Sequence, residues 1–345
     1  MHTVDLLLHG TGHVGRALLS LLERQAPLLA ERHALAFRVV GAVDRGGAIW
    51  QPTGIPPAAL LAAKAAHGSV AALPGGERGA DVLALLGRAA SPLTLLEATL
   101  VAADGGPGLA ALRAALAARH SAVSANKGPL VVALPELEAL AARHGGALSY
   151  SATVCGGLPA LAVARDDLAH ATITRMEGIV NSTTNYILTR MAAGEGYDEA
   201  LRRAQADGIA EADPALDVSG WDAANKLLIL AHAALRQPSR PADVRVEGIE
   251  GIGGEALRAA AARGEAIKLL ARAERDPSGR YALSVGPHAL PLDHPLARLE
   301  GHQMGLWLET DINGTLFLSI IEETPEPTAA AMLRDLVHQA RGARR

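Results

Sequence analysis

The stretch VDLLLHGTGHVG, residues 4–15, decides the fold. It begins with an apolar run, Val4–His9, that predicts a buried strand, and it continues into a segment with three glycines. Glycines at this spacing are typical of a tight turn between a strand and a helix. We therefore expect a strand, a glycine turn and a helix that continues to about Leu29.

The turn has the glycine spacing of a binding site for the pyrophosphate of a dinucleotide. Gly10 allows the tight turn, Gly12 lets the backbone approach the phosphates, and Gly15 lets the helix pack closely against the strand. The N-terminus of the helix offers free N–H groups and a partial positive charge to an anion. The residues predicted to bind the cofactor here are Gly10, Thr11, Gly12, His13, Val14 and Gly15.

A second predicted strand, Phe37–Val43, ends at an acid that is followed by a base. Asp44 can hold both ribose hydroxyls of NAD and repels a 2′-phosphate, whereas Arg45 can pair with that phosphate. Arg45 is equally well explained as a solvated loop residue. The sequence therefore predicts NAD or NADP as cofactor without choosing between them.

Strands and helices alternate through the first half of the chain, and this predicts a parallel sheet with helices on both faces. Residues 49–92 interrupt the pattern with prolines and glycines, so we expect irregular structure there with one or two short helices. The second half has a different, α+β pattern. The fold class is therefore α/β: a Rossmann-type doubly wound dinucleotide-binding domain plus an α+β domain. In the second half, strands are expected at 172–180, 280–285 and 304–321, and helices at 181–193, 198–207, 217–235 and 328–341.

Composition excludes several classes of function. The formal net charge of −4 argues against a general nucleic-acid binder. The single cysteine, Cys155, excludes an intrachain disulfide framework and a zinc site made of several cysteines, and it fits a reducing compartment. The sequence has no charge-free apolar stretch of about 18 residues and no signal peptide pattern at its start. We expect a cytoplasmic protein with neither a nucleic-acid nor a membrane partner.

The chain uses arginine for almost all of its positive charge and has four lysines: Lys64, Lys127, Lys226 and Lys268. Asp222 and Lys226 are four residues apart and share one face of a predicted helix. That helix continues as Leu227–Leu230, an apolar run that indicates burial, where a charged pair needs a functional reason. A partly buried lysine can release a proton near neutral pH, whereas arginine cannot. The alternative explanation is an ordinary surface ion pair.

Two polar segments follow predicted strands. Ser124–Pro129 contains Lys127 and lies at the carboxyl edge of the first sheet, where ligands bind in open α/β folds. Asn181–Tyr186 precedes a helix; N-capping by Asn181 or Ser182 explains this segment and is compatible with substrate binding.

Together these residues resemble the homoserine dehydrogenase family. The most specific matches are GIVNSTTNYIL at 178–188 and the Glu211-Ala-Asp-Pro start with Asp222 and Lys226. The chain resembles the short, monofunctional form without a C-terminal regulatory domain. The matching segments are Gly10–Gly15, Val39–Asp44, Leu96–Thr99, Ser124–Pro129, Tyr150–Pro159, Gly178–Leu188 and Glu211–Lys226.

The resemblance implies that NAD(P)H reduces L-aspartate 4-semialdehyde reversibly to L-homoserine, a step in threonine, methionine and isoleucine biosynthesis. It implies that Lys226 protonates the developing alkoxide and that Lys127 assists at the same oxygen. Thr99 and Lys127 would contact the cofactor. The residues that would bind the amino-acid substrate are Glu211, Asp222, Asp217 and Thr183.

The resemblance also implies a domain plan, a partner and a metal. Residues 1–149 with 322–345 would form the dinucleotide-binding domain, and 150–321 the catalytic and dimerisation domain of a homodimer. Backbone carbonyls of Val154, Gly156 and Leu158 would hold a sodium ion. This chain departs from the family pattern here, since Ser151 stands where many members have glutamate and Cys155 where most have glycine.

Two alternatives remain open at this point. Cys155 precedes a predicted helix, so the chain could be a cysteine-dependent semialdehyde dehydrogenase that forms an acyl phosphate. A further departure lies before the last helix, where Glu322 and Glu323 replace the glycines of a loop near the cofactor. This change bears on cofactor affinity more than on catalysis, and it leaves open a catalytically impaired relative of the family.

Overall fold

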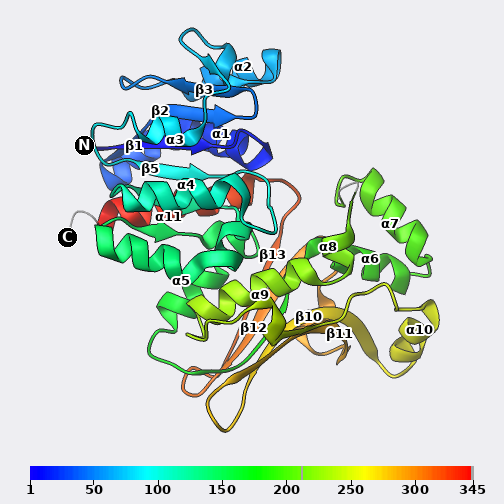
Figure 1. The fold of residues 1–345 in the computed structure, drawn as a ribbon. Coiled ribbons are helices and arrows are strands. Elements are labelled where there is room, and N and C mark those ends of the chain that lie inside the picture. The colour runs from blue at the N-terminus through cyan, green and yellow to red at the C-terminus, as the bar shows by residue number, and fades with distance from the viewer. Residues whose placement is uncertain (211–212, 343–345) are drawn as a thin grey trace. The chain divides into compact units, whose positions relative to one another are not determined.

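The computed structural model describes residues 1–210 and 213–342. The chain forms two compact units, one of Met1–Gly157 with Thr324–Arg345 and the other of Leu158–Glu323 (Figure 1). The first unit thus extends beyond the expected limit at residue 149. The reason is that Ser151–Thr153 forms a short 3₁₀ helix that packs against the last helix of the chain.

A seven-stranded sheet forms the centre of the first unit, in the order β4-β3-β2-β1-β5-β6-β7. The five strands from β2 to β7 in this order are parallel. The sheet is not parallel throughout, because Arg45 and Gly46 form a two-residue hairpin turn and β3 and β4 follow it in antiparallel pairs. The strands are β1 (His2–His9), β2 (Leu35–Asp44), β3 (Gly47–Trp50), β4 (Glu77–Arg78), β5 (Thr94–Glu97), β6 (Ser121–Ser124) and β7 (Leu148–Ser149).

Two groups of helices cover the sheet of the first unit. The crossover from β1 to β2 and the crossover from β5 to β6 run in opposite directions along the sheet, and both are right-handed. The two groups of helices therefore lie on opposite faces: α1, α2 and α11 on one face, and α3, α4 and α5 on the other (Figure 1). The helices are α1 (His13–His33), α2 (Pro57–His67), α3 (Val82–Leu86), α4 (Gly106–Ala117), α5 (Lys127–His144) and α11 (Glu326–Gly342).

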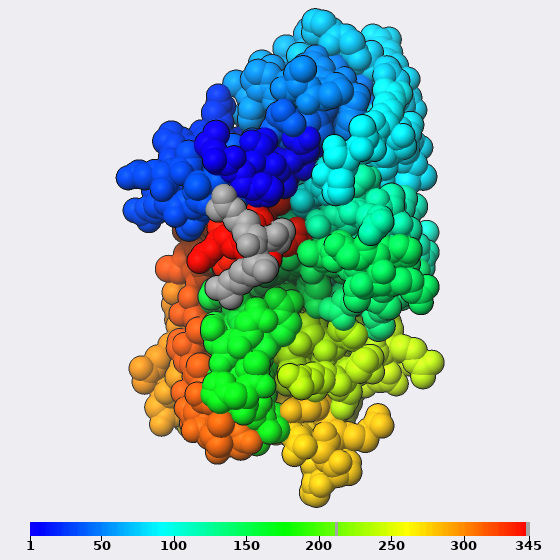
Figure 2. All heavy atoms as spheres, turned by 90° about the vertical axis from the view of Figure 1, so that its left-hand side faces the viewer, coloured from blue at the N-terminus to red at the C-terminus, as the bar shows by residue number. Residues whose placement is uncertain are grey.

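The last helix, α11, belongs to the core of the first unit. Met332 and Leu336 of α11 lie in one buried cluster with Leu8 of β1 and Leu18 of α1. Figure 2 shows the C-terminal residues (red) next to the N-terminal residues (blue). The first unit is therefore discontinuous in sequence.

The second unit is built on a six-stranded sheet in the order β13-β12-β8-β10-β11-β9. Its pairs are antiparallel except for β11 with β9. The expected hairpin at Asp311–Gly314 joins β12 to β13. The strands are β8 (Ile173–Ile179), β9 (Val244–Val246), β10 (Glu265–Arg275), β11 (Tyr281–Pro291), β12 (Gln303–Thr310) and β13 (Thr315–Ile321). The helices are α6 (Ser182–Ala192), α7 (Tyr197–Ala206), α8 (Ala215–Val218), α9 (Trp221–Ala233) and α10 (Gly254–Ala262).

Within the described ranges, 1–210 and 213–342, no helix is both long and apolar enough to cross a membrane.

Candidate active site

The glycine turn joins β1 to α1. Gly10 has a φ of +103°, and a Cβ atom there would lie 2.5 Å from the carbonyl oxygen of Ala98. A Cβ atom at Gly15 would lie 2.1 Å from the carbonyl oxygen of Gly10, so α1 approaches the turn closely only because Gly15 has no side chain. At Gly12 a Cβ atom would meet no described atom within 4 Å. The turn therefore leaves open space beside the N-terminus of α1, as a bound phosphate requires.

The other three residues of the turn differ in burial. His13 is exposed, and Val14 is partly buried and packs against the core of the first unit. Thr11 is 2% exposed, and its hydroxyl donates to the Asp44 carboxylate over 3.1 Å. The turn is thus tied to the end of β2.

Asp44 lies at the end of β2 with its side chain only 4% exposed. Burial raises the pKa of this carboxyl, but hydrogen bonds from Lys64, Ser69 and the backbone outweigh it and hold the pKa below its ordinary value. Both oxygens of the carboxylate therefore already accept hydrogen bonds, which counts against the hypothesis that Asp44 holds two ribose hydroxyls. The five donors are the Lys64 ammonium (2.8 Å), the Ser69 hydroxyl (2.8 Å), the Thr11 hydroxyl (3.1 Å) and the N–H groups of Gly46 (2.9 Å) and Val70 (3.0 Å).

Lys64 is a residue of this site that the sequence interpretation did not include. It reaches from α2 to Asp44 and also donates to the Gly68 carbonyl oxygen over 2.7 Å. Its side chain is 22% exposed, whereas Arg45 is exposed in the hairpin turn. The scarcity of lysine was the one sequence signal that could have drawn attention to Lys64.

A buried polar network lies at the carboxyl ends of β1, β5 and β6. Glu97 is 0% exposed; it contacts the His9 imidazole over 2.6 Å and accepts from the Thr99 N–H over 3.0 Å and from the Thr99 hydroxyl. Asn126 donates to Glu97 over 3.3 Å and to the Thr99 hydroxyl over 3.0 Å. The network thus fixes Thr99, a predicted cofactor residue. Its other members, His9, Glu97 and Asn126, were not predicted.

Lys127 is the first residue of α5 and follows Asn126 directly. Asn126 caps this helix, because its side-chain oxygen accepts from the Gly128 N–H over 3.0 Å. The same amide donates to Glu97, so the buried network fixes the backbone from which the half-buried Lys127 projects. Lys127 and the cofactor candidates therefore all belong to the first unit.

The second unit holds Lys226 and Asp222 on α9. The Lys226 ammonium lies 2.8 Å from an Asp222 oxygen, and the two side chains are only 15% and 8% exposed. The ammonium also donates to the Val180 carbonyl oxygen over 2.6 Å. The expected i,i+4 pair is therefore present, and it is largely buried rather than on the surface.

Asp217 lies on α8, not on the same helix as Lys226. The expected helix at 217–235 is instead two helices, because Gly220, with a φ of +84°, separates α8 from α9 and is the N-cap of α9. Asp217 and Asp222 are nevertheless brought together by the Asn181 amide, which donates to the first over 2.7 Å and to the second over 2.8 Å. Asn181 is also the N-cap of α6, as one sequence interpretation proposed.

Thr183 lies in the first turn of α6 and is 5% exposed. Its hydroxyl donates to the Ile209 carbonyl oxygen over 3.2 Å. This bond ties α6 to the segment that leads to residue 211. Glu211, the remaining predicted substrate residue, lies outside the described residues.

The segment predicted to bind sodium is buried. Val154 and Leu158 are 0% and 3% exposed, and Gly156 has a φ of +52°. Ser151 donates from its N–H and its hydroxyl to Asp335 of α11, over 2.8 and 2.7 Å. No cluster of three or more His, Cys, Asp or Glu side chains suited to a metal occurs among the described residues. A sodium site made of backbone carbonyls needs no such side chains.

Cys155 does not fit the role of a nucleophile. Its thiol belongs to a residue that is only 1% exposed, with a φ of +54°. A reactive thiol needs access to its substrate, whereas buried structural cysteines are inert. The structure therefore does not support the cysteine-dependent alternative.

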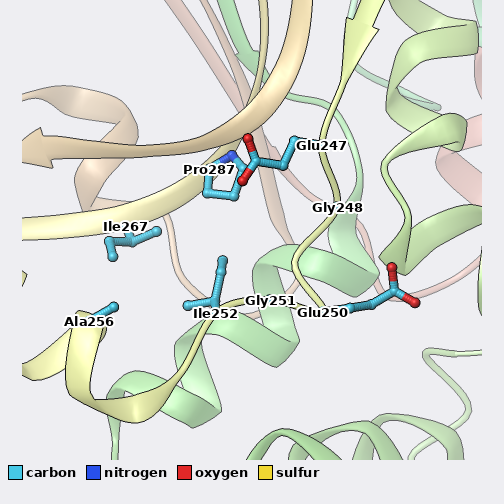
Figure 3. Close-up of a pocket in the computed structure, with 8 residues that line it drawn as sticks. All are labelled: Glu247, Gly248, Glu250, Gly251, Ile252, Ala256, Ile267 and Pro287. Carbon is cyan, nitrogen blue, oxygen red and sulfur yellow. The ribbon is translucent and has the colours of Figure 1, made fainter.

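One pocket of about 330 Å³ lies elsewhere in the second unit (Figure 3). It opens between the end of β9, the start of α10 and the strands β10 and β11, and its wall combines Ile252 and Ile267 with Glu247. The predicted substrate residues of the described chain do not line it. We therefore do not identify it with the active site.

These features define a class of protein. A strand–glycine turn–helix with an open helix N-terminus is the pyrophosphate site of a dinucleotide-binding fold. A largely buried lysine held by a carboxylate is the arrangement of a proton donor. The class is that of the NAD(P)-dependent oxidoreductases.

Comparison with known proteins gives the family. The family model described as homoserine dehydrogenase matches residues 159–337. The chain is 33% identical to an NAD(+)-dependent homoserine dehydrogenase of Pseudomonas canavaninivorans, over 98% of this chain and 96% of the other. It is 30% identical to a homoserine dehydrogenase of Methanocaldococcus jannaschii, over 97% and 98% of the two chains.

The fold agrees with solved structures of the same family. A hyperthermophilic archaeal homoserine dehydrogenase in complex with NADPH superposes with a TM-score of 0.83, at 26% identity, over 98% of each chain. The chain belongs to the homoserine dehydrogenase family. It is accordingly an NAD(P)-dependent oxidoreductase, and the cysteine-dependent alternative has no support.

Proposed function

We propose that Lys226 is the proton donor in the reversible reduction of L-aspartate 4-semialdehyde to L-homoserine by this chain. The observation that carries the proposal is the Lys226 ammonium, which is largely buried and is held by Asp222 and by the Val180 carbonyl oxygen. Two acceptors fix the direction of the ammonium, and a lysine held in this way can exchange its proton with a substrate oxygen. Arginine could not take this role because it keeps its proton.

The proton moves between Lys226 and the substrate oxygen. In the direction of reduction the ammonium protonates the carbonyl oxygen as that oxygen gains negative charge, and in the direction of oxidation the free amine accepts the proton from the alcohol. We assign Lys127 to the same oxygen as a second donor. We assign Asp217, Asp222 and Glu211 to the substrate ammonium, with Thr183 placing the segment before Glu211.

NAD or NADP fits the first unit. Residues 10–15 and the N-terminus of α1 would hold the pyrophosphate, since open space borders Gly12. Asp44, Arg45 and Lys64 would face the adenosine ribose, and Thr99 and Lys127 the other end of the cofactor. The bound cofactor supplies or accepts the hydride. The relatives support both cofactors, since one is an NAD(+)-dependent homoserine dehydrogenase and another was solved in complex with NADPH.

Substitution of Lys226 tests the proposal. The initial rate of L-homoserine oxidation at alkaline pH is measured with NAD and with NADP for the parent, Lys226→Ala and Lys226→Arg. We expect both variants to lose at least about 100-fold in kcat, because neither can exchange the proton. Normal turnover by Lys226→Arg would contradict proton transfer at this residue. An inactive parent would favour the catalytically impaired alternative.

Domain roles and assembly complete the proposal. The first unit would bind the cofactor, and the second would bind the substrate and form a homodimer. Phe317 and Ile321 support the dimer, since they are 38% and 61% exposed on the same face of the edge strand β13. Sedimentation of the active enzyme as a monomer would contradict this assembly.

The setting of the reaction is also part of the proposal. We place the enzyme in the cytoplasm, in threonine, methionine and isoleucine biosynthesis, and the single reduced cysteine supports a reducing compartment. A sodium ion on the carbonyls of Val154, Gly156 and Leu158 would brace the segment at 150–159. Equal stability and rates in sodium and in a bulky organic cation would contradict that ion.

A further inference from the structure

We propose that Asn181 is a positioning residue for the reaction, because its side-chain amide links Asp222, the partner of Lys226, to Asp217. The amide nitrogen donates to Asp217 over 2.7 Å and to Asp222 over 2.8 Å. This role rests on the function proposed above and deepens it. Asn181 acts through its neighbours and is assigned no contact with the substrate.

The start of α6 fixes the orientation of the amide. The Asn181 side-chain oxygen accepts from the Thr184 N–H over 2.8 Å and from the Thr184 hydroxyl over 3.0 Å. An N-cap must present an acceptor to this N–H, so the oxygen faces the helix and the nitrogen faces the acids. The amide nitrogen has two hydrogens, and each has its own carboxylate.

A neutral donor suits this place. Asp222 is 6% exposed and Asp217 is half-buried, and both carboxylates contact one amide nitrogen, so the two acids repel each other in partly dry surroundings. Hydrogen bonds from an amide favour the ionised form of both carboxylates without adding charge. A lysine here would neutralise an acid that the substrate ammonium needs, and an aspartate would add a third negative charge.

The same acid also holds Lys226. One Asp222 oxygen accepts from the Asn181 amide and lies 2.8 Å from the Lys226 ammonium. Lys226 donates in addition to the carbonyl of Val180, the residue before Asn181. The junction of β8 and α6 therefore fixes both the lysine and its acid. The titratable groups that the described structure places in this cluster are Asp217, Asp222 and Lys226.

Asn181→Ser separates the two roles of Asn181. Serine caps a helix about as well as asparagine, so the melting temperature should change little. It cannot supply two donors to the acids, and a small misplacement of reacting groups costs on the order of 100-fold in rate. We expect kcat for L-homoserine oxidation to fall roughly 10- to 100-fold. We also expect the acid limb of the pH profile of kcat/KM to move to higher pH, because the carboxylates lose donors that favour their ionised form.

Thr184→Val is the matched control. It removes the hydroxyl that donates to the side-chain and backbone oxygens of Asn181, but it leaves the Thr184 N–H donor and both contacts of the amide to the acids. We expect kcat of Thr184→Val to lie within about threefold of that of the parent, which is less than the tenfold change that 1.4 kcal/mol represents. We also expect the acid limb of its pH profile of kcat/KM to stay where it is in the parent. If circular dichroism shows that Asn181→Ser does not fold, Asn181→Asp replaces it, because aspartate also caps.

The outcomes separate this role from the function itself. If the parent is active and Asn181→Ser has the same kcat and the same acid limb as the parent, the role of Asn181 is overturned and the function stays intact. Equal shifts in Asn181→Ser and Thr184→Val would assign the effect to the helix cap alone and would also overturn it. A parent that does not oxidise L-homoserine would overturn the proposed function, and this role with it.

Discussion

At the scale of the single residue, Lys64 decides what Asp44 can do. The Lys64 ammonium lies 2.8 Å from an oxygen of Asp44, the acid that would otherwise accept a ribose hydroxyl and repel a 2′-phosphate. In the sequence, Asp44 favours NAD and Arg45 favours NADP, but the sequence could not show the third charged group, the Lys64 ammonium from α2. The contact joins residues twenty positions apart, and no local pattern encodes it.

We predict that Lys64→Met shifts cofactor preference toward NAD. Without its charged partner, Asp44 regains an acceptor for the ribose and repels a phosphate. A hydrogen bond to a charged group is worth about 1.5–3 kcal/mol, so the ratio of kcat/KM for NAD to that for NADP should rise tenfold or more. Arg45→Met is the control, because it removes an exposed charge of the same turn but leaves Asp44 paired. An unchanged ratio in Lys64→Met would show that Asp44 does not face the ribose.

At the scale of the element, β10 shows where sequence patterns fail. Glu265–Arg275 forms an eleven-residue strand at the centre of the second unit, but its alanines, arginines and glutamates are typical helix formers. Lys268–Ala271 is buried on both faces, so the alternation that reveals a strand is absent. In contrast, β1 and α1 could be predicted because the glycine turn between them leaves few alternatives.

We predict that Lys268, on β10, makes stability depend on pH in the alkaline range. Burial lowers the pKa of Lys268 from 10.5 to about 8, while its ammonium donates to the carbonyl oxygen of Leu299 over 2.5 Å. Between pH 8 and 10.5 the unfolded chain binds the extra proton, so the free energy of unfolding rises with pH, by at most about 3 kcal/mol. Urea titrations at pH 7, 8, 9 and 10 measure this rise, and Lys268→Met should lack it. Parallel curves for the two proteins would contradict the prediction.

At the scale of the whole molecule, the chain makes two units and returns to the first. Asp335 of α11 is 4% exposed and accepts from both the N–H and the hydroxyl of Ser151. The family resemblance implied the return of the last helix, but it gave no sign of this contact. The partners Ser151 and Asp335 lie far apart in sequence, so no local pattern predicts their contact.

We predict that Asp335→Ala destabilises the first unit by at least about 2 kcal/mol, because it leaves two buried donors without their acceptor. Ser151→Ala is the milder companion, since it removes one hydroxyl donor and should cost about 1 kcal/mol. Thermal and urea unfolding of the two variants measure the difference. Equal, negligible effects would mean that α11 is held by its apolar face alone.

The candidate site shows the same division between local and distant information. Asp222 and Lys226 could be predicted as a pair because four residues on a helix fix their distance. Their connection to Asp217 through Asn181, and that of Thr99 to His9 through Glu97, depends on chain segments brought together by tertiary packing. The sequence therefore predicts the groups that we propose for the chemistry, and the structure adds the side chains that hold them.

The most direct test of the account uses the aldehyde itself. L-Aspartate 4-semialdehyde is mixed with NADH or NADPH, and the loss of reduced cofactor is followed while L-homoserine is identified as product. We predict saturable, phosphate-independent consumption by the parent and almost none by Lys226→Ala. No consumption by the folded parent would contradict a homoserine dehydrogenase with Lys226 as its proton donor. Phosphate-dependent reduction of NAD or NADP, in a parallel assay of the aldehyde with oxidised cofactor, would contradict it as well.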